Sequence, residues 1–228
     1  WYANGNNKTY AIDNISIRAE SIVGRTNVPV EVPYHFRDEF KENSLDRYIG
    51  TKKTHRQYYP ETNEIADNGR YVRYLPGNPT FVGETVTTIT VRRTEELSVA
   101  AVVAFGNPGT IYPVGSADNY RTTGNNVLSV EFFGTRTGAY IDGVLVSNFD
   151  TIAPLSVGDS RTYTITYNGL DTITVDDGVN SQTITNSAFA IRQKYTVIHG
   201  TYSSAQDAGR TIRFGLVDIS GTRVYNKP

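Results

Sequence analysis

The sequence predicts an all-β fold of two packed antiparallel sheets. Three observations predict it: apolar and polar residues alternate over short runs, Asn-Gly and Asp-Gly dipeptides separate these runs, and no segment shows the period of an α-helix. Short strands with turns at regular spacing favour a two-sheet sandwich, and a barrel is the alternative that the sequence separates poorly from it.

The clearest strands lie in residues 161–184, which read RTYTITYNGLDTITVDDGVNSQTI. Tyr163, Ile165 and Tyr167 alternate with threonines, which is the period of a strand with one buried face. Dipeptides that supply the positive φ of tight hairpin turns follow these strands and interrupt residues 139–147. They are Asn168-Gly169, Asp177-Gly178 and Asp142-Gly143.

The remaining strands are expected in order along the chain, with polar and irregular structure at residues 49–69. Only residues 97–105, which read LSVAAVVAF, are apolar on both faces, and this predicts a central strand covered on both sides. The expected strands span residues 36–40, 71–75, 84–93, 97–105, 127–133, 139–147, 161–167, 171–175, 181–185, 194–199 and 210–216.

The first 33 residues are expected to lie outside the main module, which spans residues 34–228. Residues 9–20 read TYAIDNISIRAE and predict a strand without local partners. This strand either closes a preceding module or docks on this one as an arm. Residues 21–33 contain Pro29 and Pro33 and are predicted to be a stiff linker. The chain starts at Trp1 and has no Met, so we expect a fragment or a processed product.

Composition argues against several classes of function. The chain has 22 basic and 23 acidic residues, so neither nucleic acid nor an anionic membrane is an expected partner. It has no cysteine for disulfides or thiolate metal sites, and no apolar run of transmembrane length. The three histidines lack zinc-site spacing, and no calcium-loop motif occurs, so we expect no metal and no cofactor.

Two segments resemble the concanavalin A-like (laminin G-like) jelly roll: residues 161–184, and residues 36–48, which read FRDEFKENSLDRY. The resemblance covers about residues 34–220 and implies a jelly-roll sandwich that binds glycans or surfaces. Modules preceded by a strand like IDNISI look like those of bacteriophage fibres and secreted bacterial polysaccharide-binding proteins. This implies an extracellular or virion-surface location. The implied partners are a polysaccharide or cell-surface glycan, a neighbouring module of the same polypeptide and, as one alternative, further copies of the chain.

Aromatic and basic residues between positions 47 and 74 form the first candidate ligand site. Flat rings stack on the apolar faces of sugars, and arginine forks bind hydroxyls and carboxylates. Alternatively, these tyrosines cap the open end of the sandwich or pack against a neighbouring subunit. Tyr58 and Tyr59 are expected in a polar loop. The candidates are Arg56, Tyr58, Tyr59, Tyr71, Arg73 and Tyr74.

A long loop at residues 108–124 supplies a second set of candidates, because long ordered loops are often functional. Tyr112, Tyr120 and Arg121 are expected to line one rim of a cleft. The alternative is an insertion that covers a sheet edge, and we favour this alternative.

Catalysis is not predicted, because the paired strand carboxylates of sandwich glycosidases are missing. Arg93-Thr94-Glu95 and Ile198-His199-Gly200 loosely resemble strands of β-sandwich alginate lyases, where His and Tyr would serve as base and acid. Val197 stands where that family has Gln, and the closing strand of the family is missing. The prediction is therefore non-catalytic polysaccharide recognition. The alternatives are a structural building block of a virion or fibre and, second, a polysaccharide lyase.

Overall fold

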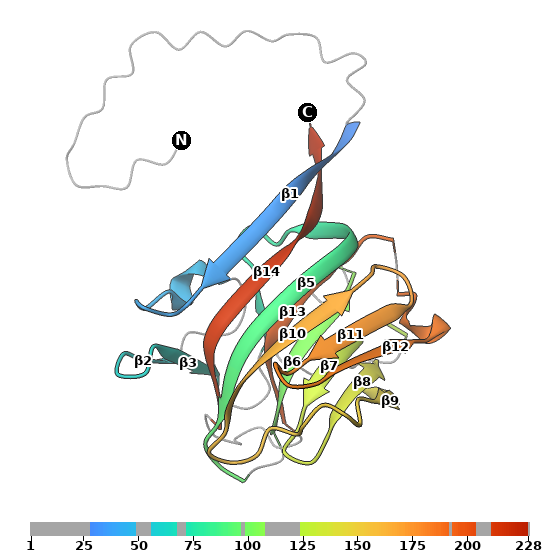
Figure 1. The fold of residues 1–228 in the computed structure, drawn as a ribbon. Coiled ribbons are helices and arrows are strands. Elements are labelled where there is room, and N and C mark those ends of the chain that lie inside the picture. Colours follow the sequence, from blue (N-terminus) through green and yellow to red (C-terminus); the bar gives the residue numbers. More distant parts are fainter. Residues whose placement is uncertain are drawn as a thin grey trace, which may run out of the picture.

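The computed structural model describes residues 28–48, 56–67, 72–96, 99–107, 124–191, 193–203 and 211–227. These residues form two antiparallel sheets packed face to face, which confirms the predicted all-β sandwich (Figure 1). Sheet A contains β1 (Val28–Asp38), β2 (Arg56–Tyr59), β3 (Glu64–Asp67), β5 (Thr80–Arg93), β10 (Ser160–Tyr167), β11 (Thr172–Asp176), β12 (Ser181–Thr185) and β14 (Ile212–Lys227). Sheet B contains β4 (Val72–Tyr74), β6 (Val99–Gly106), β7 (Leu128–Phe132), β8 (Thr137–Ile141), β9 (Val144–Asn148) and β13 (Thr196–Ser203).

Strands far apart in the chain are neighbours in both sheets. Sheet A runs β12-β11-β10-β5-β14-β3-β2, and β1 also pairs with β14. Sheet B runs β4-β13-β6-β7-β8-β9. The described part of the chain adds two short 3-10 turns, Leu45–Arg47 and Ser187–Phe189, and contains no helix with the length and apolarity needed to span a bilayer.

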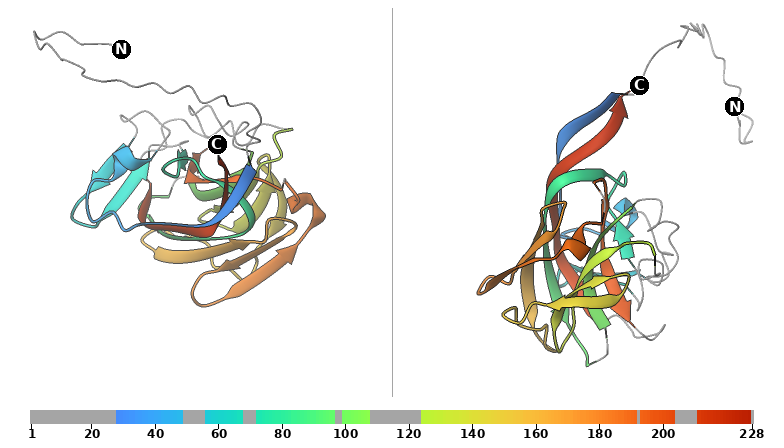
Figure 2. Two further views of the ribbon diagram at one scale, coloured as in Figure 1. Left: turned by 90° about the horizontal axis from the view of Figure 1, so that it is seen from above. Right: turned by 90° about the vertical axis from the view of Figure 1, so that its right-hand side faces the viewer.

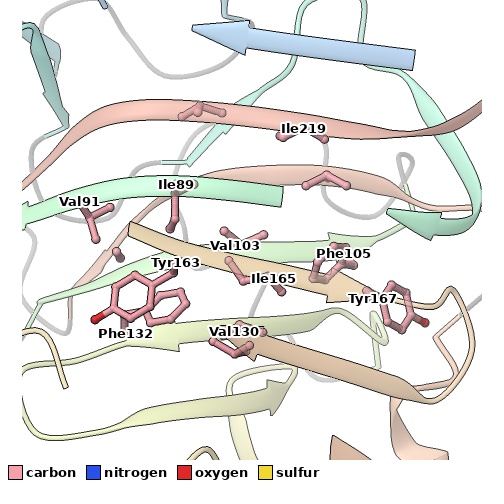
Figure 3. Packing of buried hydrophobic residues seen from close by; sticks show 14 of the residues in the cluster. Ile89, Val91, Val103, Phe105, Val130, Phe132, Tyr163, Ile165, Tyr167 and Ile219 are labelled. Atoms are coloured by element: carbon pink, nitrogen blue, oxygen red, sulfur yellow. The ribbon is translucent and has the colours of Figure 1, made fainter. Parts of the chain in front are cut away.

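The main core lies between the two sheets. Tyr163, Ile165 and Tyr167 are fully buried in it, as their alternation with threonine predicted (Figure 3). The ring of Tyr163 stacks on that of Phe132 in the opposite sheet, with centroids 4.0 Å apart. Burying one such side chain stabilises the fold by about 1.5–3 kcal/mol, so these contacts hold the sheets together.

All eight residues of β6 are buried, which confirms the predicted central strand. Its odd-numbered residues, such as Val103, face the core between the sheets. Its even-numbered residues, such as Val102, join Val127 and Ile198 in a second small cluster on the other face of sheet B. Both faces of this strand are therefore apolar because both are covered.

The predicted turns form in two different ways. Asp142 (φ 49°) and Gly143 (φ 78°) make the expected two-residue hairpin between β8 and β9. Gly169 and Gly178 have positive φ in the expected β10–β11 and β11–β12 hairpins, but the loops there are longer than two residues and span residues 168–171 and 177–180. The reason is local hydrogen bonding: Asn168 Oδ1 accepts the backbone N–H groups of the three residues from 170 to 172.

A second correction concerns residues 49–69, which were expected to be irregular. Residues 56–59 and 64–67 form the hairpin β2–β3, in which Tyr58 pairs with Ile65. β3 also pairs with β14, and Ile65 and Ala66 are fully buried. These burials provide the driving force for two strands that show no clear alternation in the sequence.

β1 and β14 pair over the whole length of β1, from Val28 opposite Lys227 to Asp38 opposite Val217. Residues 28–30 and 225–227 extend beyond the pair Val224–Thr80, where the contact of β14 with β5 ends, and project from the sandwich as a stalk (Figure 2). We call this part the β1–β14 stalk. Of the expected linker at residues 21–33, residues 28–33 are therefore strand. Proline is tolerated there because β1 is an edge strand. The expected strand at residues 9–20 lies outside the described residues, and the domain boundary at residue 33 stays a prediction.

Candidate functional sites

The structure distributes the first set of candidate residues over both sheets. Arg56, Tyr58 and Tyr59 lie in β2 of sheet A, whereas Arg73 and Tyr74 lie in β4 of sheet B. Four further candidates lie outside the described residues: Tyr71, Tyr112, Tyr120 and Arg121. Their roles stay predictions.

Tyr58 and Tyr59 lie in a strand rather than in the polar loop expected from the sequence, so they point to opposite faces of sheet A. Tyr58 is partly buried and packs against the main core, which gives it a structural role. Tyr59 is partly buried on the outer face. The guanidinium carbon of Arg213 lies 3.7 Å from the centroid of its ring, which is a close cation–π contact.

Arg213 belongs to a charged group on the outer face of sheet A. It lies directly opposite Arg92 of β5 in the β5–β14 register. The carboxylate of Glu64 forms an ion pair with Arg92, lies 3.7 Å from Nη1 of Arg213, and accepts a hydrogen bond of 2.8 Å from Thr62 Oγ1. We call Tyr59, Glu64, Arg92 and Arg213 the Arg–Tyr patch.

Sequence reasoning found Tyr59 but missed the other three members of the Arg–Tyr patch. They come from β3, β5 and β14, which are far apart in the chain and meet only through strand pairing. No motif marks them. Two guanidinium groups share one carboxylate here, so the patch carries a net positive charge.

A cleft of about 390 Å³ opens at the end of the sandwich where β5 ends. We call it the end cleft. It lies between the segment that follows β5, the β7–β8 connection and the β9–β10 connection. Its lining residues are Arg93, Glu96, Phe133, Gly134, Thr135, Ser156 and Val157.

Arg93 is held rigidly in the end cleft. Its Nε donates to the carbonyl of Glu95 at 3.1 Å, and its Nη1 donates to the carbonyl of Val99 at 3.2 Å. Burial lowers the pKa of the Arg93 guanidinium, while Glu96 acts in the opposite direction. Gly134 lies close beside it: a Cβ there would be 2.8 Å from the guanidinium carbon and would displace the end of the Arg93 side chain.

The rest of the end cleft combines an aromatic ring with exposed polar groups. Phe133 is partly buried, and the Arg136 guanidinium lies 5.6 Å from the centroid of its ring. Glu96, Thr135 and Ser156 are exposed at the rim. A ring face, a guanidinium, a carboxylate and hydroxyls thus converge in a small concave volume, as in many sites for small polar ligands.

His199, the base of the lyase alternative, lies in the core. It is fully buried, and its ring contacts those of Tyr48 and Phe214 at centroid distances of 5.3 and 5.9 Å. A side chain between the sheets cannot reach a polymer bound on the surface, which argues against the lyase alternative. The described residues also contain no group of three or more His, Cys, Asp or Glu that could hold a metal ion.

Comparison with known proteins finds no matching family model and no matching curated sequence. Solved structures do match. Peanut lectin with a nine-residue peptide has a TM-score of 0.58 at 9% identity, over 86% of this chain and 100% of that chain. Lectin I from Ulex europaeus, in complex with the methyl glycoside of α-L-fucose, has a TM-score of 0.58 at 10% identity, over 83% and 98%. The Lotus tetragonolobus seed lectin has a TM-score of 0.57 at 14% identity, over 86% and 100%.

The protein has the concanavalin A-like jelly-roll fold. This confirms the resemblance seen in residues 36–48 and 161–184. Within the jelly roll, Arg92 and Arg93 are successive residues of β5 and point to opposite faces of sheet A. Arg92 joins the Arg–Tyr patch, and Arg93 lines the end cleft. Both candidate sites therefore gather at the same end of the sandwich.

Proposed function

We propose that this protein is a non-catalytic carbohydrate-recognition module that binds a glycan in the end cleft. The observation that carries the proposal is the convergence of Phe133, Arg93 and Glu96 with two hydroxyl side chains in about 390 Å³. Ligand pockets measure about 300–1,000 Å³, so this cleft suits one or two sugar units.

Each group in the end cleft has a part in sugar recognition. The ring of Phe133 offers an apolar face for the C–H face of a pyranose. Arg93 donates to ring or hydroxyl oxygens, and the Glu96 carboxylate accepts hydrogen bonds from hydroxyls. Thr135 and Ser156 donate and accept at the rim. The lectin from Ulex europaeus with a bound fucoside supports the proposal, because it has the same fold.

A glycan array followed by calorimetry on the purified chain tests this function. Glu96→Gln should weaken binding about ten-fold or more, because hydrogen bonds to charged groups contribute about 1.5–3 kcal/mol. Ser156→Ala should weaken it about two- to ten-fold, because neutral hydrogen bonds contribute about 0.5–1.5 kcal/mol. Glu84→Gln is the matched control: it removes an exposed carboxylate near the other end of β5, about 30 Å away by the rise of a strand. No binding to any glycan refutes the function, and unchanged affinity in both cleft variants refutes the site.

We also propose that the module works outside the cell, in a phage fibre or a secreted bacterial protein, because cell-surface polysaccharides are accessible to proteins there.

A second candidate role, as a structural building block, is favoured by the β1–β14 stalk. Val28 and Tyr225 are 57% and 43% exposed there, so the stalk offers apolar contacts to a neighbouring module or another copy. Light scattering tests this role: a stable trimer or larger assembly with a blank glycan array supports it, and a dilute monomer contradicts it.

A further inference from the structure

We infer that the Arg–Tyr patch is a second binding site, which takes an acidic group of a polysaccharide: a uronate carboxylate or a sulfate ester. This inference goes beyond the end cleft, because it concerns the outer face of sheet A. It rests on the proposed function only in assigning the acidic group to a glycan.

The first observation is the direct pairing of two like charges. Arg92 and Arg213 are cross-strand neighbours, and like charges directly opposite each other destabilise a sheet. Among the described residues, Glu64 is the only carboxylate within ion-pair distance of either arginine. One carboxylate leaves a positive charge uncompensated, and an anionic ligand would compensate it.

The second observation is that the hydrogen bonding of both arginines is incomplete. The Nε atoms of Arg92 and Arg213 are buried and have no hydrogen-bond partner. The side chains are nevertheless 30% and 22% exposed, so other atoms of each guanidinium reach solvent. Planar guanidinium forks match the paired oxygens of a carboxylate or a sulfate, and this geometry adds specificity to the charge.

The third observation is that contacts within the protein organise the patch. Tyr59 stacks on Arg213, and Thr62 holds the carboxylate of Glu64, whose side chain is only 10% exposed. Both arginines contact the β2–β3 hairpin: Arg92 pairs with Glu64, and Arg213 lies over the ring of Tyr59. Preorganised groups lose little conformational freedom on binding, so a shallow site of this kind can still be selective.

Calorimetry on the full chain with three polymers tests the inference: polygalacturonate, dextran sulfate and uncharged dextran. We expect binding of at least one acidic polymer and a ten-fold or greater loss of its affinity in both Arg92→Gln and Arg213→Gln. The control is Arg223→Gln, which removes the same charge from an exposed position of β14 at the base of the β1–β14 stalk. The affinity should also depend less steeply on salt in the two patch variants than in the control. The two acidic polymers show which group the site prefers.

Other outcomes overturn the inference. Equal losses in all three variants indicate attraction by net charge alone, and unchanged affinity in both patch variants removes the site. If circular dichroism shows that Arg213→Gln loosens the β2–β3 hairpin, the affinity of Arg92→Gln decides the test. Polyphosphate binding as tightly as the acidic polymers contradicts the assignment to a glycan. If glycans bind and only Glu96→Gln weakens them, the proposed function stands and the patch fails. If no glycan binds, both fail.

Discussion

A contact between two glycines gives the sharpest test of the fold. Gly169 in the β10–β11 loop has φ 79°, and Gly83 in β5 has φ 64°. A Cβ on residue 169 would lie 2.3 Å from the carbonyl oxygen of Gly83 and 2.8 Å from its carbonyl carbon. Backbone atoms cannot rotate away as a side chain can. Gly169→Ala must therefore move the loop or the strand.

Two costs add in Gly169→Ala. The left-handed conformation costs a residue with a Cβ about 1–2 kcal/mol. Forcing extra atoms into a packed site costs about 1–3 kcal/mol more. The free energy of unfolding should therefore fall by about 2–5 kcal/mol, and the midpoint of thermal unfolding should fall by about 2–4 °C per kcal/mol in a domain of this size.

Gly178→Ala is the matched control, because Gly178 also lies in a loop of sheet A, with φ 83°, but has nothing within 4 Å of the added Cβ. It should lose only the conformational cost of about 1–2 kcal/mol. Urea unfolding followed by circular dichroism measures both variants, and equal slopes show that the denatured states are comparable. If the two losses agree within about 0.5 kcal/mol, the close approach of the loop to β5 is wrong.

Three further predictions concern stability and catalysis. Burial raises the pKa of Asp177, but hydrogen bonds from three backbone N–H groups and the charge of Arg161 outweigh this effect, so the pKa is lowered in the folded protein. The free energy of unfolding should therefore fall as the pH drops through this lowered pKa. Chemical denaturation between pH 2 and 5 should show a flatter dependence of stability on pH for Asp177→Asn than for the wild-type protein. Phe132→Ala should destabilise the fold by about 3–5 kcal/mol in urea, since it removes the ring stacked on Tyr163. His199→Ala should lower the free energy of unfolding by about 2–4 kcal/mol without changing glycan affinity, because His199 is buried in the core. The wild-type protein should release no ultraviolet-absorbing unsaturated uronates from polygalacturonate. If it does release them and His199→Ala does not, the placement of His199 in the core is contradicted.

The sequence predicts those strands in which the pattern of apolar and polar residues within the strand itself matches the pattern of burial. Tyr163 and Tyr167 alternate with threonines because one face of β10 meets the core, and β6 is uniformly apolar because both its faces are covered. The β2–β3 hairpin escapes prediction because the full burial seen in β3 concerns just two adjacent residues, Ile65 and Ala66, which make no alternating pattern. Their burial depends on pairing with β14, which a local pattern does not contain.

The candidate sites were harder to predict than the fold. Tyr59 stood out as an aromatic residue in a polar stretch, but its partner Arg213 is set by the register of β14 against β5 and β3. The end cleft likewise joins Arg93 at the end of β5 with Phe133 and Ser156 from two separate connections. Such sites arise from long-range topology, so residue types and spacing along the chain do not reveal them.

The β1–β14 stalk has a mechanical consequence. Val28 and Lys227 face each other at its tip, and the hydrogen bonds of an antiparallel pair lie perpendicular to the strands (Figure 2). A force that separates these two ends would load the bonds one after another, as in opening a zipper. The opening would meet added resistance at Val224, where Thr80 of β5 contributes a third strand. Each residue freed before that point would lengthen the tether by about 3.4 Å per strand. The stalk would thus act as a yielding element that absorbs load while both candidate sites of the sandwich stay intact.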